Sequence, residues 1–138
     1  MGVEDISFYG SVVSVSTDRD IKICNIDMTY KGKCSLINAD CLEIVKTEFM
    51  TEFFSGFTMP GCVVAMMVDE SGAVKGLPVN LLASYLYGSH LHGNYIYGDV
   101  FFFELSSSGF DHVLSEPDAV AAHLTHLDFS LYEDGFYE

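Results

Sequence analysis

Apolar and polar positions alternate in the first part of this chain, with the period of a half-buried β-strand. Residues 6–16 (ISFYGSVVSVS) combine this alternation with β-branched and aromatic side chains, and we expect a bend at Gly10. After a turn at residues 17–20, the alternation is repeated through Ile21 and Ile23. The two segments together predict a β-hairpin.

The following part of the chain mixes strand and turn patterns. Residues 28–37 (MTYKGKCSLI) contain a Lys-Gly-Lys sequence that predicts a turn. Residues 40–50 (DCLEIVKTEFM) fit a strand better than a short helix, because Val45 and Thr47 are β-branched. Aromatic residues, two glycines and a proline interrupt the pattern over residues 51–61, where we expect a loop or flap.

Two uninterrupted apolar runs predict buried strands near the centre of a sheet. The first covers residues 62–68 (CVVAMMV), and the second covers residues 100–103 (VFFF). Between them, residues 69–72 (DESG) have turn composition, and residues 73–77 (AVKGL) are expected to form a short returning strand.

Two short helices are predicted as well. Asn80 is a suitable N-cap for a helix of about two turns that ends before Gly88, and so short a helix needs a sheet to pack against. A Ser-Glu-Pro-Asp start signal precedes the second helix, over residues 118–127. Residues 128–138 (DFSLYEDGFYE) are expected to form an edge strand or a mobile tail that orders on a partner.

The pattern as a whole predicts one α+β domain over residues 1–138, with a mostly antiparallel sheet, two short helices and an acidic C-terminal extension at residues 106–138. The length suits a single core, and no apolar run is long enough for a membrane helix. The first residues do not resemble a secretory signal, and the spacing of the four cysteines favours reduced thiols. We therefore expect a cytoplasmic location.

The charge changes the functional picture more than the rest of the composition does. Twenty acids and six bases give a formal net charge of −14, and no Lys or Arg follows Lys75. The carboxylates after that residue are Asp99, Glu104, Asp111, Glu116, Asp118, Asp128, Glu133, Asp134 and Glu138. Direct binding of nucleic acid is disfavoured, because it requires basic side chains at the phosphates, whereas a basic protein partner suits this field. A solvated coat that only aids solubility explains the charge equally well.

Three short pieces, DESGAVKGLPVN, LLASYLYG and IYGDVFFF, resemble a family of small phage- and plasmid-borne proteins that is described only as a domain of unknown function. The matching positions are Gly72, Gly76, Pro78, Asn80, Gly98 and Asp99. The resemblance covers residues 21–105, but it explains neither the aromatic segment at 51–61 nor the acidic extension. It implies a small α+β domain of mobile-element origin and implies no reaction. Turn and capping chemistry accounts for these residues, so we expect Asn80 and Asp99 to be structural.

Histidines are the main candidates for chemistry. In a strand, His90 and His92 would point to one side and could begin a metal site together with Asp99, whereas a polar loop is the simpler interpretation. His123 and His126 could share a helix face, but the sequence lacks the glutamate of a zinc-protease motif. There is no phosphate-binding loop and no nucleophile elbow. We therefore predict no catalytic residue and no cofactor.

Three functions remain open from the sequence. The preferred one is a non-enzymatic binding protein of mobile-element origin that inhibits a host defence nuclease, in the manner of an anti-CRISPR or antirestriction protein. Its acidic surface would occupy a basic nucleic-acid-binding surface, and aromatic residues near the C-terminus would either anchor the partner or pack in the core. The predicted partner-binding residues are Asp111, Glu116, Asp118, Asp128, Phe129, Tyr132, Glu133, Asp134, Phe136, Tyr137 and Glu138. The alternatives are a small metal-dependent hydrolase or ligand-binding protein that uses His90 and His92, and an oligomeric structural protein.

Overall fold

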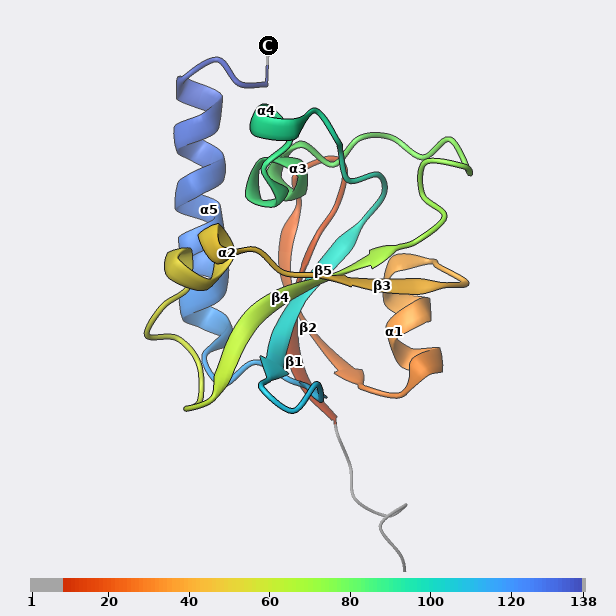
Figure 1. Cartoon of the computed structure of the whole chain (residues 1–138), viewed down its shortest axis with the longest axis vertical. Coiled ribbons are helices and arrows are strands. Elements are labelled where there is room, and N and C mark those ends of the chain that lie inside the picture. Colours follow the sequence, from red (N-terminus) through yellow and green to blue (C-terminus); the bar gives the residue numbers. More distant parts are fainter. Residues whose placement is uncertain (1–8, 138) are drawn as a thin grey trace, which may run out of the picture.

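The computed structural model describes residues 9–137, and it contains a six-stranded antiparallel sheet with helices packed on it (Figure 1). The strands are β1 (Tyr9–Val15), β2 (Ile21–Asp27), β3 (Leu42–Val45), β4 (Cys62–Asp69), β5 (Val100–Ser106) and β6 (Asp111–His112). The helices are α1 (Tyr30–Ile37), α2 (Glu48–Phe53), α3 (Leu81–Tyr87), α4 (Ser89–His92) and α5 (Pro117–Glu133). The predicted α+β single-domain fold is confirmed, with five helices in this part of the chain instead of two.

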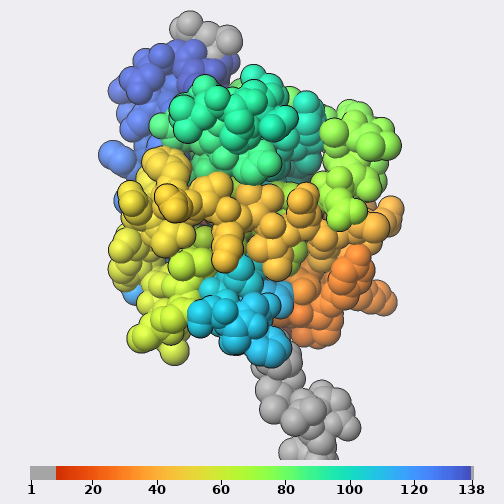
Figure 2. Space-filling view, in the orientation of Figure 1, coloured from red at the N-terminus to blue at the C-terminus, as the bar shows by residue number. Residues whose placement is uncertain are grey.

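The sheet has the strand order β2-β1-β5-β4-β3, and β6 pairs with the end of β5. The predicted hairpin is confirmed, with β1 and β2 paired from Tyr9 and Asp27 to Val15 and Ile21. Its start at residues 6–8 lies outside the described residues. Figure 2 shows α2 and β3, in yellow and orange, next to the green and teal segment that carries α3 and α4. No helix within residues 9–137 is long and apolar enough to cross a membrane.

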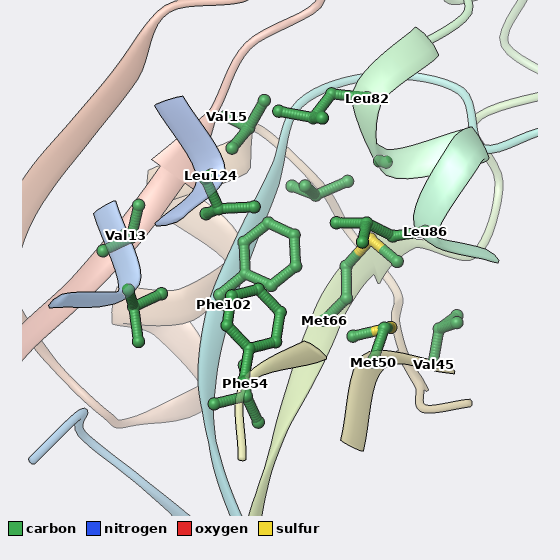
Figure 3. Packing of buried hydrophobic residues seen from close by; sticks show 14 of the residues in the cluster. Val13, Val15, Val45, Met50, Phe54, Met66, Leu82, Leu86, Phe102 and Leu124 are labelled. Carbon is green, nitrogen blue, oxygen red and sulfur yellow. The ribbon is translucent and has the colours of Figure 1, made fainter. Parts of the chain in front are cut away.

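The two apolar runs form β4 and β5, which are buried strands in the interior of the sheet, as predicted, and the structure shows that they pair with each other. Their side chains are buried on both faces, which explains why the sequence shows continuous apolar runs here rather than alternation. On one face, Phe102 and Met66 contact a core that includes Leu82 of α3 and Leu124 of α5 (Figure 3). On the other face, a smaller cluster contains Ile37 of α1.

Helix α3 is built as the sequence predicts. The side-chain Oδ1 of Asn80 accepts a hydrogen bond from the amide of Ala83 at 3.2 Å, and Gly88 ends the helix with a positive φ of 95°. The Nδ2 group of Asn80 donates to the carbonyl oxygens of Val15 and Gly98, both at 3.0 Å. This buried side chain therefore caps α3 and also holds it against β1 and the residues before β5.

The predicted Lys-Gly-Lys turn is wrong, because these residues lie in α1. Thr29 caps the helix by accepting from the amide of Gly32 at 3.1 Å, and Asn38 ends it in the left-handed conformation. Gly32 is needed for a close contact, since a Cβ at this position would lie 2.0 Å from the carbonyl oxygen of Asp27. The glycine thus marks close backbone packing and does not mark a turn.

The strand predicted over residues 40–50 is correct only for β3. Thr47 is the N-cap of α2 and accepts from the amide of Met50 at 3.1 Å, so its hydroxyl decides the local structure here and its β-branching does not. Helix α2 also includes the first three residues of the expected flap, and Met50 and Phe54 are buried in the core on either side of them. Residues 54–61 contain no helix or strand, as expected of a loop.

The returning strand predicted at residues 73–77 is absent, and a turn replaces it. The buried carboxylate of Asp69 accepts hydrogen bonds from the amide of Ser71 at 2.8 Å and from Nζ of Lys75 at 2.6 Å. The hydrogen bond to Asp69 raises the pKa of Lys75. These hydrogen bonds stabilise the turn from within, so residues 73–77 need no pairing with a neighbouring strand.

Helix α5 is longer than predicted, since residues 128–133 continue it and form neither an edge strand nor a tail. Val120, Leu124 and Leu131 are buried against the sheet, which holds the helix along its whole length. Residues 107–109 form a turn between β5 and β6.

Candidate protein-binding surface

The predicted partner-binding acids do not form one patch. Asp111 lies in β6 and forms an ion pair of 2.5 Å with Lys33 of α1. Both side chains are largely buried, at 26% and 14% exposure. This carboxylate is therefore neutralised within the fold, which removes it from the surface that we predicted.

Apart from Asp128, the remaining acids of α5 and its caps are divided between the two ends of the helix. Glu116 and Asp118 are at the N-terminal end, and Glu133 and Asp134 are at the C-terminal end. A helix of 17 residues is about 25 Å long, so the two groups are separated by the length of the helix. Favourable interaction with the helix dipole accounts for Asp118, which lies in the first turn.

The aromatic residues also separate into two pairs. Phe136 packs edge-on against Tyr85 of α3, with ring centroids 5.6 Å apart, and it joins the main core together with Tyr137. Phe129 and Tyr132, by contrast, are 59% and 61% exposed. Phe136 and Tyr137 therefore pack in the core. Phe129 and Tyr132 remain candidates for anchoring a partner.

The turn between β1 and β2 contacts the end of α5. The guanidinium group of Arg19 lies 4.3 Å from the ring centroid of Tyr137 and 5.2 Å from that of Tyr132. A shallow pocket of about 320 Å³ between these elements is lined in part by Asp18 and Leu81. No local pattern indicates the contact between Arg19 and the two tyrosines, because these residues are more than a hundred positions apart and meet only in the tertiary structure.

Tyr137 and Asp128 lie in the same region. The Tyr137 hydroxyl and Oδ1 of Asp128 are buried and have no hydrogen-bond partner within residues 9–137. Burial raises the pKa of Tyr137, the nearby Asp128 carboxylate raises it further, and the charge of Arg19 opposes both effects. Asp128 is thus half-buried and lies behind the exposed face, while Glu138 lies outside the described residues.

We define the α5 surface as Asp18, Phe129, Tyr132, Glu133 and Asp134. Two exposed aromatic side chains lie one helical turn apart; the exposed Glu133 and Asp134 follow Tyr132 in the chain, and Asp18 lines a pocket together with Tyr132. These acids form no ion pair within the described part of the chain. Aromatic anchors inside a polar rim are typical of protein interfaces.

The histidine pair lies neither in the strand of the metal-site hypothesis nor in the polar loop that we favoured from the sequence. His90 and His92 are in α4, not in a strand, and the ring of His90 stacks on Tyr85 at 4.9 Å. Nε2 of His92 is 3.1 Å from the carbonyl oxygen of Tyr87, and its Nδ1 accepts from the amide of Asn94 at 3.1 Å. Across residues 9–137, no group of three His, Cys, Asp or Glu side chains is placed to hold a metal ion.

Asp99 and the histidines of α5 have separate environments. Asp99 accepts a hydrogen bond from the amide of Thr17 at 3.0 Å, which is the structural role that we predicted. His123 packs in an aromatic cluster with Phe53, whose ring centroid is 4.2 Å away, and with Phe57. Of His123 and His126, only His126 is exposed to solvent, as expected for a solvated helix face.

The carboxylate of Glu104 in β5 is buried, which its place in the run of C-terminal acids does not predict. Its Oε1 accepts from the amide of Met59 at 3.0 Å, and its Oε2 accepts from the amide of Ser115 at 2.6 Å. Glu104 is 1% exposed, and with burial it raises the pKa of the nearby Cys62 thiol. It joins the loop at 54–61 to the start of α5, so its role is structural.

Comparison of the chain with protein-family models, with curated proteins and with solved structures gives no match. The resemblance to a mobile-element family therefore stays a prediction. The structure explains several of its positions by packing: a Cβ at Gly72 would lie 2.5 Å from the carbonyl oxygen of Tyr97, and Gly98 has a φ of 91°. These glycines are therefore required by backbone packing and conformation, and they do not indicate a binding or catalytic site.

Proposed function

We propose that this chain is a non-enzymatic acidic protein that binds a basic protein through the α5 surface. The single observation that carries the proposal is the exposure of Phe129 and Tyr132 beside carboxylates that form no ion pair in the described residues, with Arg19 over the ring of Tyr132 as the one cation that we find next to them. Aromatic side chains supply the contact area, and the surrounding acids select a positively charged partner.

The proposed partner is a host defence nuclease, and the proposed effect is inhibition of the anti-CRISPR or antirestriction type. The net charge of −14 opposes direct binding of this chain to phosphate groups. It favours binding to a basic protein surface that normally binds phosphates. Such fields accelerate association with an oppositely charged protein and weaken as salt rises. The mobile-element origin and the cytoplasmic location are part of this proposal and rest on the sequence patterns.

The spacing of the anchors supports recognition through a helix face. Phe129 and Tyr132 are three residues apart in α5, and Glu133 follows on the same side as Phe129 at a spacing of four. A helix that presents anchors at these spacings can lie in a groove of its partner. Because Leu124 and Leu131 hold the opposite face in the core, the anchors are presented on a rigid element.

The test is capture of binding proteins from the host or from infected cells, followed by elution with increasing salt and a nuclease assay with the captured protein. Changing Phe129 and Tyr132 together to alanine is expected to weaken binding by roughly several hundredfold, because hot-spot residues contribute about 2 kcal/mol or more each and a tenfold change corresponds to about 1.4 kcal/mol. Phe110→Ala is the matched control, since Phe110 is 65% exposed in the turn between β5 and β6.

Charge is tested separately. Glu133→Gln with Asp134→Asn is expected to slow association and reduce its salt dependence, whereas Glu48→Gln with Glu52→Gln on α2 leaves both unchanged. Capture that is indifferent to salt, or equal losses from the α5 and control variants, would contradict the proposal. Capture of a basic protein with no effect on nuclease activity would retain the binding surface but reject inhibition.

A further inference from the structure

A second hollow lies on the sheet, away from the α5 surface. It has a volume of about 310 Å³ and is formed by the ends of β3 and β4, the turn after β4 and the segment at residues 93–97. In Figure 2 these parts of the chain, in orange, green and teal, lie next to one another on one face. None of the lining residues belongs to α5 or to the turn between β1 and β2.

The pocket has an apolar floor and aromatic walls. Val45, Val68 and Ile96, each less than a tenth exposed, contribute to the floor. Three tyrosines, Tyr87, Tyr95 and Tyr97, line the pocket as well. A volume of this size is at the lower limit for small-molecule sites, so it suits an amino-acid side chain or a metabolite of similar size.

Two carboxylates give the pocket a negative charge. Glu43 of β3 lies opposite Val68 of β4, and Glu70 is the first residue of the turn after β4, so both acids line the same pocket. Neither forms a hydrogen bond or ion pair through its side chain within residues 9–137. The third acid in the lining, Asp69, is already neutralised by Lys75.

Two like charges that line one pocket repel one another, and exposure to water weakens this repulsion without removing it. A cation between Glu43 and Glu70 removes the repulsion, and tyrosine rings attract it through their π faces. Among cationic groups, guanidinium suits the pocket best, because it is planar, weakly hydrated and able to stack on an aromatic ring while it bonds to carboxylates. The apolar floor suits an alkyl stem.

We propose that this pocket binds a guanidinium group on an alkyl stem, which is the chemistry of arginine. Glu43 and Glu70 bind the charged group, the tyrosines enclose it, and Val45, Val68 and Ile96 contact the methylene groups. The inference does not depend on the function proposed for the α5 surface, because the two sites share no residue.

The test is a titration of the full chain, followed by the backbone amide NMR signals of residues 93–97. The probe is Nα-acetyl-L-arginine methylamide, and Nα-acetyl-L-citrulline methylamide is the neutral control of nearly the same shape. The arginine probe is expected to give saturable shifts at these residues, whereas the citrulline probe binds about tenfold more weakly or not at all. Free L-arginine distinguishes the source: tighter binding than the blocked probe indicates a metabolite, and weaker binding indicates an arginine of a protein.

Variants test the assigned contacts. Tyr95→Leu is expected to weaken binding of the arginine probe about fivefold, as for loss of one partly exposed cation–π contact. Glu43→Gln combined with Glu70→Gln weakens it by at least as much, and Glu52→Gln on α2 leaves it unchanged. Amide signals outside the pocket show whether each variant is folded. Equal affinity for the two probes, no saturable shift at residues 93–97, or a double variant that behaves like Glu52→Gln would overturn the proposal.

Discussion

Substitution of Glu104 tests whether one buried carboxylate holds the C-terminal helix to the rest of the fold. Glu104→Gln keeps one acceptor oxygen but places an NH₂ group against the amide of either Met59 or Ser115. A hydrogen bond to a charged group contributes about 1.5–3 kcal/mol, and an unsatisfied buried donor adds to the loss. Part of this loss is regained because a buried charge is removed. We expect Glu104→Gln to lower the free energy of unfolding by about 2 kcal/mol, and Glu104→Ala by about 4 kcal/mol.

The measurement is urea unfolding of both variants, together with hydrogen exchange of the two amides. The amides of Met59 and Ser115 should lose protection in Glu104→Ala before the amides of β4 and β5 do. Glu52→Gln, at an exposed position of α2, is the control and should stay within about 0.5 kcal/mol of the parent chain. A Glu104→Gln protein as stable as the parent, with both amides still protected, would refute this account of the residue.

Two further predictions concern single contacts. Gly32→Ala should destabilise the chain by more than about 1 kcal/mol in thermal unfolding, because its Cβ would collide with the carbonyl of Asp27. The control Ser35→Ala, on the exposed side of α1, should not destabilise it. Equal melting temperatures of the two variants would contradict the close contact. Burial raises the pKa of Tyr137 in the folded state, so its contribution to stability is complete below the ordinary tyrosine pKa of about 10 and is lost as the pH rises further. Tyr137→Phe should remove this part of the alkaline decline, as measured by urea unfolding between about pH 8 and 11, and an unchanged decline would show that the hydroxyl is not buried.

Where local chemistry decides the structure, the sequence was sufficient. Asn80 and Gly88 define both ends of α3 through their own backbone and side-chain preferences. The hairpin of β1 and β2 follows from alternation around a short turn. The free state of all four cysteines also agrees with their spacing.

The sequence-based prediction was wrong where one residue type can have two structural roles. Gly32 and Thr47 looked like a turn and a strand, but a close backbone contact and an N-cap are their actual roles. Their neighbours in space, Asp27 and Met50, are what distinguish the alternatives. The length of α5 was missed for a similar reason, since residues 128–133 read as an acidic aromatic tail until Leu131 is seen to reach the core.

The sequence by itself determined the charge, the central strands and the α+β class, because these depend on composition and on periodicity along the chain. Only the tertiary structure decided which charges are available: it pairs Asp111 with Lys33, buries Glu104, and leaves Glu43 and Glu70 exposed beside three tyrosines. The physical reason is that neutralisation and burial depend on distances between residues far apart in the chain, which no local pattern specifies.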